Sequence, residues 1–239
     1  MWPFKKIKSH KKKTVKWLKR GKGIEIGAFK TPIEGIKPFY VDKFHEFAGE
    51  RCLADVYSEP VHLPFYSSSL DYVAASHVIE HIANPVAAIC EWYRVLRPGG
   101  IMYMVVPDRR YSWDRFRNLT TCAHMFDDYV KGTTDCDATH IDDFVDNVDW
   151  SEFDPSTPAE DVPLKKKERK KVYHHAVSAG EIINIHFHVY EPANVMDLFK
   201  KMTEHPQINL KLTILDCEEQ FPASSPNGFL IVVQVNKTL

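Results

Sequence analysis

The stretch Lys22-Gly23-Ile24-Glu25-Ile26-Gly27-Ala28-Phe29 decides how the rest of the chain is interpreted. Ile24 and Ile26 alternate with Glu25, which predicts a short buried strand over residues 23–26, and Gly27 stands where that strand must bend. The turn after the first strand is where open α/β sheets bind ligands, and a glycine there leaves room for a ligand against the backbone. A glycine after a short apolar run is also typical of an ordinary turn, so the interpretation depends on the rest of the chain.

Composition limits the classes of protein that the chain can represent. Its 239 residues suit one α/β domain with an insertion or a small cap, and 44% apolar with 26% charged residues is ordinary for a globular protein. The net charge of −1 gives the whole molecule no attraction to a polyanion. Five scattered cysteines without a CxxC pair indicate a reducing compartment. With neither a signal peptide nor a membrane span in evidence, we expect a cytoplasmic protein.

The first 20 residues form a basic arm or helix. Residues 5–22 contain nine Lys and one Arg and no acidic residue, with aromatic and aliphatic side chains between them. One interpretation is a weak contact with a membrane surface or a nucleic acid. The other is a solvated helix that covers the sheet of the domain predicted over residues 21–239.

The chain then alternates between strands and turns or helices. Further strands are predicted over residues 37–42, 51–57, 70–78 and 101–107, and a closing hairpin over 209–216 and 229–235. A helix is predicted from Pro85, capped by Asn84 and stopped by Pro98-Gly99-Gly100. This alternation is typical of a mostly parallel sheet with helices on both faces.

Residues 108–189 interrupt the alternation and are predicted to form a cap inserted after the fifth strand. A helix is expected over 118–131, a loop over 151–163, and the start of a solvated helix in the basic run 165–171. Ile185-His186-Phe187-His188-Val189 alternates like a strand, which would place both histidines on one face.

The histidines of the cap are the catalytic candidates, namely His186, His188 and His124. Three roles stay open for the pair at 186 and 188: a general base, two ligands of a metal ion, or hydrogen-bonded groups within the cap. No metal ligands are assigned from the sequence. Four arginines, at positions 109, 110, 115 and 117, would either hold an acidic acceptor or pair with acids of the insertion.

A succession of motifs resembles a known enzyme family. It comprises Leu63-Pro64-Phe65, Ser69-Leu70-Asp71-Tyr72-Val73, Ser76-His77-Val78-Ile79-Glu80-His81-Ile82, Asn84-Pro85 and Arg94-Val95-Leu96-Arg97-Pro98-Gly99-Gly100. In this order and spacing, the motifs resemble the class I S-adenosylmethionine-dependent methyltransferases, in particular their broad small-molecule branch. The resemblance implies a Rossmann-like α/β fold with a seven-stranded, mostly parallel sheet closed by an antiparallel hairpin.

The resemblance also implies a cofactor site for S-adenosyl-L-methionine. Matched position by position, its residues are Glu25, Gly27, Ala28, Asp42, Glu59, Pro60, Ser76 and His77. Asp42 matches the acid that binds the ribose, and the alternative open to it is a surface Asp that caps the next turn. Glu59 matches the adenine-binding acid, with Asp55 as its rival. Glu80-His81 resembles a Glu-His pair of the family, for which we expect a structural or cofactor-lining role and not a catalytic one. The opening turn departs from the family pattern, because two later glycines are replaced in Gly27-Ala28-Phe29-Lys30-Thr31-Pro32.

The function expected on this basis is methyl transfer to a small-molecule or glycan-type acceptor, at oxygen. An inactive methyltransferase-like binding module is the alternative, and the altered glycine turn favours it. An RNA-directed enzyme recruited by the basic arm is a third hypothesis, but nucleic-acid binding is not expected because the rest of the chain is not basic. The sequence gives no oligomeric state.

Overall fold

The computed structural model describes residues 10–18, 21–224 and 226–237. Its elements are α1 (His10–Trp17), β1 (Gly23–Ile26), β2 (Phe39–Asp42), β3 (Glu46–Phe47), β4 (Glu50–Arg51), β5 (Val56–Tyr57), β6 (Leu70–Ser76), η1 (Ile79–His81), α2 (Pro85–Val95), β7 (Leu96–Pro107), η2 (Arg109–Tyr111), α3 (Cys122–Lys131), α4 (Ile141–Asn147), α5 (Trp150–Phe153), η3 (Ala159–Asp161), α6 (Val162–Ser178), α7 (Pro192–Glu204), β8 (Leu212–Phe221) and β9 (Gly228–Val235).

The main sheet has seven strands in the order β5-β2-β1-β6-β7-β9-β8. The first five in this order pair in parallel, whereas β9 pairs antiparallel with both β7 and β8. This confirms the predicted α/β fold with its closing hairpin. The third predicted strand was too long, because only Val56–Tyr57 joins the sheet and Arg51 lies in the separate β3–β4 hairpin.

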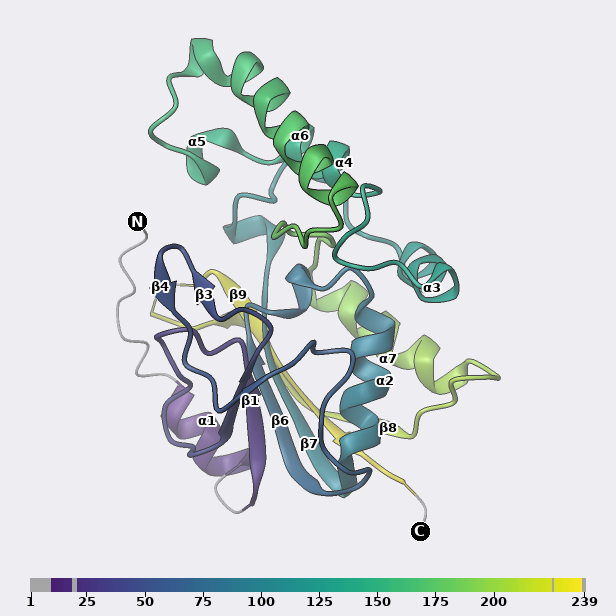
Figure 1. Cartoon of the computed structure of the whole chain (residues 1–239). Helices are drawn as coiled ribbons and strands as arrows, with labels where there is room; N and C mark the ends of the chain where they lie inside the picture. Colours follow the sequence, from purple (N-terminus) through teal and green to yellow (C-terminus); the bar gives the residue numbers. More distant parts are fainter. Residues whose placement is uncertain (1–9, 19–20, 225, 238–239) are drawn as a thin grey trace.

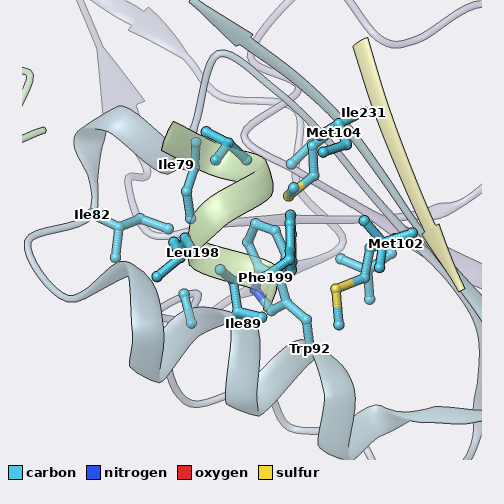
Figure 2. Packing of buried hydrophobic residues seen from close by; sticks show 14 of the residues in the cluster. Ile79, Ile82, Ile89, Trp92, Met102, Met104, Leu198, Phe199 and Ile231 are labelled. Carbon is cyan, nitrogen blue, oxygen red and sulfur yellow. The ribbon is translucent and has the colours of Figure 1, made fainter. Parts of the chain in front are cut away.

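Helices cover both faces of the sheet (Figure 1). On one face α2 and α7 pack over a core that includes Trp92, Phe199 and Met102, as Figure 2 shows. On the other face the helix α1 and the loop after β1 cover a smaller core around Tyr103 and Leu230. The helix α2 begins as predicted, since Asn84 Oδ1 accepts a hydrogen bond from the Ala87 amide at 3.0 Å.

The basic N-terminal segment contacts the sheet where it is described. In α1, Lys13 forms ion pairs with Asp216 at 3.0 Å and Glu218 at 2.7 Å, and Trp17 Nε1 donates to Asp216 at 3.2 Å. His10 is buried against the Tyr103 hydroxyl at 3.0 Å. These contacts agree with a helix that covers the sheet. The remainder of the predicted arm, residues 1–9 and 19–20, lies outside the described residues.

The segment between β7 and α7 lies beyond the carboxyl ends of the parallel strands (Figure 1). Residues 108–191, all of which the structure describes, form helices and turns but no strand. Phe144, Trp150 and Ile185 belong to a hydrophobic core of this segment, which also includes Ala83 from the turn before α2. The predicted helix over 118–131 is α3, whereas the predicted loop over 151–163 contains part of α5 and all of η3.

Among the residues that the structure describes, no helix is both long enough and apolar enough to cross a membrane.

Candidate active site at the strand ends

Gly27, Asp42 and Ser76 lie at one level of the sheet. Ile26 pairs with Val41 on one side and with Ala75 on the other. The residues that follow these three, Gly27, Asp42 and Ser76, therefore stand at the carboxyl ends of β1, β2 and β6. We call this edge the strand-end site. It is the position at which open α/β sheets bind ligands.

Gly27 occupies a position that other residues fit poorly. Its φ is +68°, in the left-handed region that favours glycine, and a Cβ there would stand 2.7 Å from Val78 Cγ2. The next loop is tied to β1, because Glu25 Oε1 accepts a hydrogen bond from the Ile33 amide at 2.8 Å. Burial raises the pKa of Glu25 to about 7, although this hydrogen bond opposes the shift. The altered turn therefore keeps a glycine at the one position of the turn where both the φ angle and the nearby Val78 side chain disfavour a Cβ.

Two acids lie farther along the same edge. Asp42, at the end of β2, is buried and accepts a hydrogen bond from the Phe44 amide at 2.9 Å. Glu59 lies two residues beyond Tyr57, the partner of Asp42 in β5, and the next residue, Pro60, is buried and bonded through its carbonyl to Trp92 Nε1 at 3.0 Å. The rival Asp55 precedes β5, is exposed, and accepts a hydrogen bond from the Tyr40 amide at 2.9 Å. The geometry thus favours Glu59 over Asp55 as the acid at the strand ends.

The turn after β6 carries His77 into the same region. His77 has a φ of +55°, a conformation that non-glycine residues rarely adopt and that is common at functional sites. Its Nδ1 lies 3.7 Å from Glu80 Oε1, and the same oxygen lies 3.8 Å from His81 Nε2. Glu80 is fully buried, and neither of its carboxylate oxygens has a hydrogen-bond partner among the described residues. Burial raises the pKa of Glu80 to about 7.

His186 joins this group from the inserted segment. Its ring lies 4.7 Å from the ring of His81, and its Nδ1 is 2.6 Å from Asp114 Oδ2. The other oxygen of Asp114 accepts a hydrogen bond from Arg117 at 2.8 Å. Burial raises the pKa of Asp114, but its contacts with His186 and Arg117 outweigh this effect and hold that pKa below the usual value. An aspartate fixed in this way orients the imidazole and leaves Nε2 to accept a proton.

The predicted strand over 185–189 is wrong, and its two histidines do not share a face. Two amides of this segment donate to separate partners, Phe187 to the Glu80 carbonyl at 2.7 Å and Val189 to Thr120 Oγ1 at 2.9 Å. Just before the segment, the Ile183 amide donates to the Asp135 carbonyl at 2.9 Å. The segment therefore runs between other elements instead of joining a sheet.

His188 and His124 lie in a separate group, which we call the histidine cluster. Its members are His124, Asp128, His140 and His188. The structure thus brings His186 to the Glu80-His81 pair and places the other two catalytic candidates elsewhere. Sequence reasoning missed Asp114, Asp128 and His140. The only local signal was the four-residue spacing of His124 and Asp128, which places both side chains on one face of a helix.

The four arginines after β7 all have acidic partners. Arg109 pairs with Glu191 at 2.5 Å, Arg110 with Asp108 at 2.6 Å, Arg115 with Glu152 at 2.9 Å and with Asp149, and Arg117 with Asp114 at 2.8 Å and Asp143 at 2.7 Å. Of the two roles open to them, the structure shows ion pairing.

Comparisons with known proteins identify the domain. Residues 41–104 match a family model described as a methyltransferase domain. The full fold is similar to that of an S-adenosylmethionine-dependent methyltransferase from Methanosarcina mazei, with 16% identity, coverage of 100% of this chain and 99% of that one, and a TM-score of 0.50. Residues 41–104 thus carry a methyltransferase domain, and the chain as a whole has the fold of the class I S-adenosylmethionine-dependent methyltransferases.

Two further relatives add context. A Thermotoga maritima S-adenosylmethionine-dependent methyltransferase, named a possible histamine N-methyltransferase, is 16% identical over 97% of this chain and 89% of that one, with a TM-score of 0.48. An uncharacterized 37.1 kDa protein in transposon TN4556 of Streptomyces fradiae is 42% identical over 52 residues. Those residues are 22% of this chain and 14% of the Streptomyces protein, so the chain matches only a small part of that relative.

The methyltransferase domain offers its cofactor a site that fits. The turn at Gly27, the buried carboxylate of Asp42 and the acid Glu59 lie along one edge of the sheet in the order in which a methionine group, a ribose and an adenine ring would meet them. Ser76 and His77 close the same edge at the end of β6.

The Glu80 carboxyl should make the stability of the protein depend on pH. Its folded pKa of about 7 lies above the ordinary value of 4.5, so the folded state binds the proton more tightly and loses stability as pH rises through this window. We expect Glu80→Gln, which stays neutral, to gain about 2 kcal/mol of unfolding free energy relative to the native chain between pH 5 and pH 8. Urea denaturation at each pH measures this, with Glu160→Gln as the control. A difference between Glu80→Gln and the native chain that is constant with pH would contradict the assignment.

Proposed function

We propose that the protein transfers the methyl group of S-adenosylmethionine to a hydroxyl oxygen of a small-molecule or glycan-type acceptor. The observation that carries the choice of oxygen is the bond between His186 and Asp114, 2.6 Å long and buried next to the turn after β6. A hydroxyl is a weak nucleophile until its proton is removed, so an oxygen acceptor benefits from an oriented base more than an amine or a thiol does.

In this mechanism the chain positions the cofactor and the acceptor, and it removes a proton from the acceptor hydroxyl. Gly27, Asp42 and Glu59 hold the cofactor along the strand ends, and S-adenosylmethionine supplies an already activated methyl group when bound. His186 Nε2 takes the proton of the acceptor hydroxyl while Asp114 stabilises the imidazolium that forms. The inserted segment provides the remaining walls and excludes water from the reacting groups.

The class of acceptor is inferred from the charges. Two of the four lysines of α1 have acidic partners within the chain, Lys13 with Asp216 and Glu218 and Lys16 with Asp216, and the arginines after β7 are also paired. This supports an uncharged hydroxylated acceptor over a polyanion such as RNA.

The experiment is methyl transfer from tritium-labelled S-adenosylmethionine to hydroxylated small molecules and glycans. The proposal predicts a methyl ether, which survives alkaline treatment and is located on oxygen by mass spectrometry. A labelled amine, or transfer to RNA but to none of these acceptors, would contradict it.

Asp42→Ala should weaken S-adenosylmethionine binding 10- to 100-fold. A carboxylate that accepts hydrogen bonds from ribose hydroxyls contributes about 1.5–3 kcal/mol, and the alanine removes it. Calorimetry measures the loss, with Asp55→Ala as the matched control, because Asp55 lies outside the strand-end site. Equal effects of the two substitutions would show that Asp42 does not hold the ribose.

A further inference from the structure

The histidine cluster gathers four side chains from three distant parts of the inserted segment and its flank. His124 and Asp128 lie one turn apart on α3, His140 immediately precedes α4, and His188 lies between α6 and α7. Their ligand atoms all lie within 4.8 Å of one another. None of the four belongs to the strand-end site, and methyl transfer as proposed above does not use them.

The spacing matches the ligand shell of a tetrahedral metal ion. His124 Nε2 and His140 Nε2 are 2.9 Å apart, and they lie 3.4 and 3.5 Å from Asp128 Oδ2. Metal bonds of 2.0–2.1 Å separate neighbouring ligands of tetrahedral Zn²⁺ by about 3.3 Å. His188 is the fourth side chain, and one of its ring nitrogens lies within 4.8 Å of the other three ligand atoms.

The cluster leaves buried polar atoms without hydrogen bonds. Asp128 Oδ2 is the oxygen that the three histidines surround, yet it has no hydrogen-bond partner among the described residues. His188 Nδ1, in a fully buried side chain, has none within the described part of the chain either. A buried carboxylate oxygen is costly unless a cation compensates it. A metal ion bound between these side chains would be the partner of both Asp128 Oδ2 and His188 Nδ1.

The surroundings also suit a metal site. Thr133 Oγ1 donates to the other oxygen of Asp128 at 2.9 Å, Thr139 Oγ1 lies 2.9 Å from His140 Nδ1, and the Ala83 carbonyl lies 3.0 Å from His188 Nε2, which leaves Nδ1 of His188 for the ion. Such outer contacts fix the tautomer and orientation of metal-binding side chains. Three of the four ligands are buried, whereas the His124 side chain is 49% exposed, which gives an ion a route from solvent.

We propose that His124, Asp128, His140 and His188 bind one divalent transition-metal ion of the Zn²⁺ type. Four protein ligands make a closed site, which is the structural type and leaves no position for a substrate. The ion ties α3, the start of α4 and the segment before α7 to one another. Since His186 lies two residues before His188, the ion also fixes the stretch of chain that carries the proposed base.

The proposal is tested by measuring the metal content and the thermal stability of the untagged full chain. After chelation and dialysis, one equivalent of added Zn²⁺ should bind per chain, Co²⁺ should give the visible absorption of a tetrahedral complex, and removal of the ion should lower the Tm by about 5–10 °C. The side chain of His124 is half exposed, so we expect the His124→Gln variant to fold normally. This substitution should weaken Zn²⁺ binding at least 10-fold. His140→Gln should weaken it further.

Two controls make the result specific. His174→Gln removes a histidine of α6 outside the cluster and should leave Zn²⁺ binding unchanged. His186→Gln should leave it unchanged as well, because Glu80, His81 and His186 form the other group of possible ligands. The proposal would be overturned if the folded native chain bound essentially no Zn²⁺, that is, less than about 0.1 equivalent. So would binding that His186→Gln abolishes and His124→Gln does not. Binding of S-adenosylmethionine, measured in parallel, reports on the proposed function independently.

Discussion

His186→Gln should lower kcat for methyl transfer about 100-fold and leave the affinity for S-adenosylmethionine within about threefold of the native value. Glutamine preserves the approximate size of the side chain but cannot take a proton from the acceptor. His186 lies outside the residues proposed to hold the cofactor, and its Nδ1 is bonded to Asp114 at 2.6 Å, so the loss should fall on the chemical step. Initial rates with saturating cofactor and the acceptor found with labelled S-adenosylmethionine measure it.

Asp114 is the positioning residue in this mechanism, and Asp114→Asn tests that role. The substitution should shift the pH profile of kcat towards lower pH, because the neutral amide no longer stabilises the imidazolium of His186. A residue with only a structural role would lower the amount of folded enzyme without moving the profile. His174→Gln, on the exposed face of α6, is the matched histidine control for the rate. Equal rates for His186→Gln and His174→Gln would remove His186 from the mechanism.

Trp92→Ala should reduce the free energy of unfolding by about 3–5 kcal/mol. Trp92 is fully buried in the core between the sheet and α2, where Figure 2 shows it beside Ile89 and near Phe199. Alanine leaves a cavity and also removes the donor to the Pro60 carbonyl, which is bonded to Trp92 Nε1 at 3.0 Å.

Urea denaturation measures this loss. Tyr66→Ala is the control, because Tyr66 is 89% exposed and its truncation should change stability by no more than about 0.5 kcal/mol. A loss below about 1 kcal/mol for Trp92→Ala would mean that the core repacks around the missing ring.

The sheet could be predicted because its strands carry strong local signals. Residues 70–76 and 101–107 are near-continuous apolar runs bounded by turn residues, as strands buried on both faces are. The cap at Asn84 and the proline at position 85 fix the start of α2 without any tertiary information. The third strand was overestimated because edge strands are short, and nothing in Arg51–Tyr57 marks where pairing begins.

The inserted segment could not be predicted in the same way. The alternation at 185–189 is compatible with a strand, but an extended segment that pairs with no strand can alternate in the same way. Here its amides donate to the Glu80 carbonyl in η1 and to Thr120 Oγ1. The same limit applies to the candidate site. His186 and its partner Asp114 are 72 residues apart, and no periodicity relates residues that only the tertiary fold brings together. By contrast, Gly27 and Asp42 lie at the ends of strands that local pattern identifies.

The central claim is that the strand ends of this chain bind S-adenosylmethionine, and calorimetric titration of the native protein with this cofactor tests it most directly. We predict one binding site per chain with a Kd between about 1 μM and 1 mM, comparable to the usual range of enzyme–substrate affinities, and competition by S-adenosylhomocysteine. No detectable binding by a protein that is folded by circular dichroism would contradict the claim and would leave the inactive binding module as the better description.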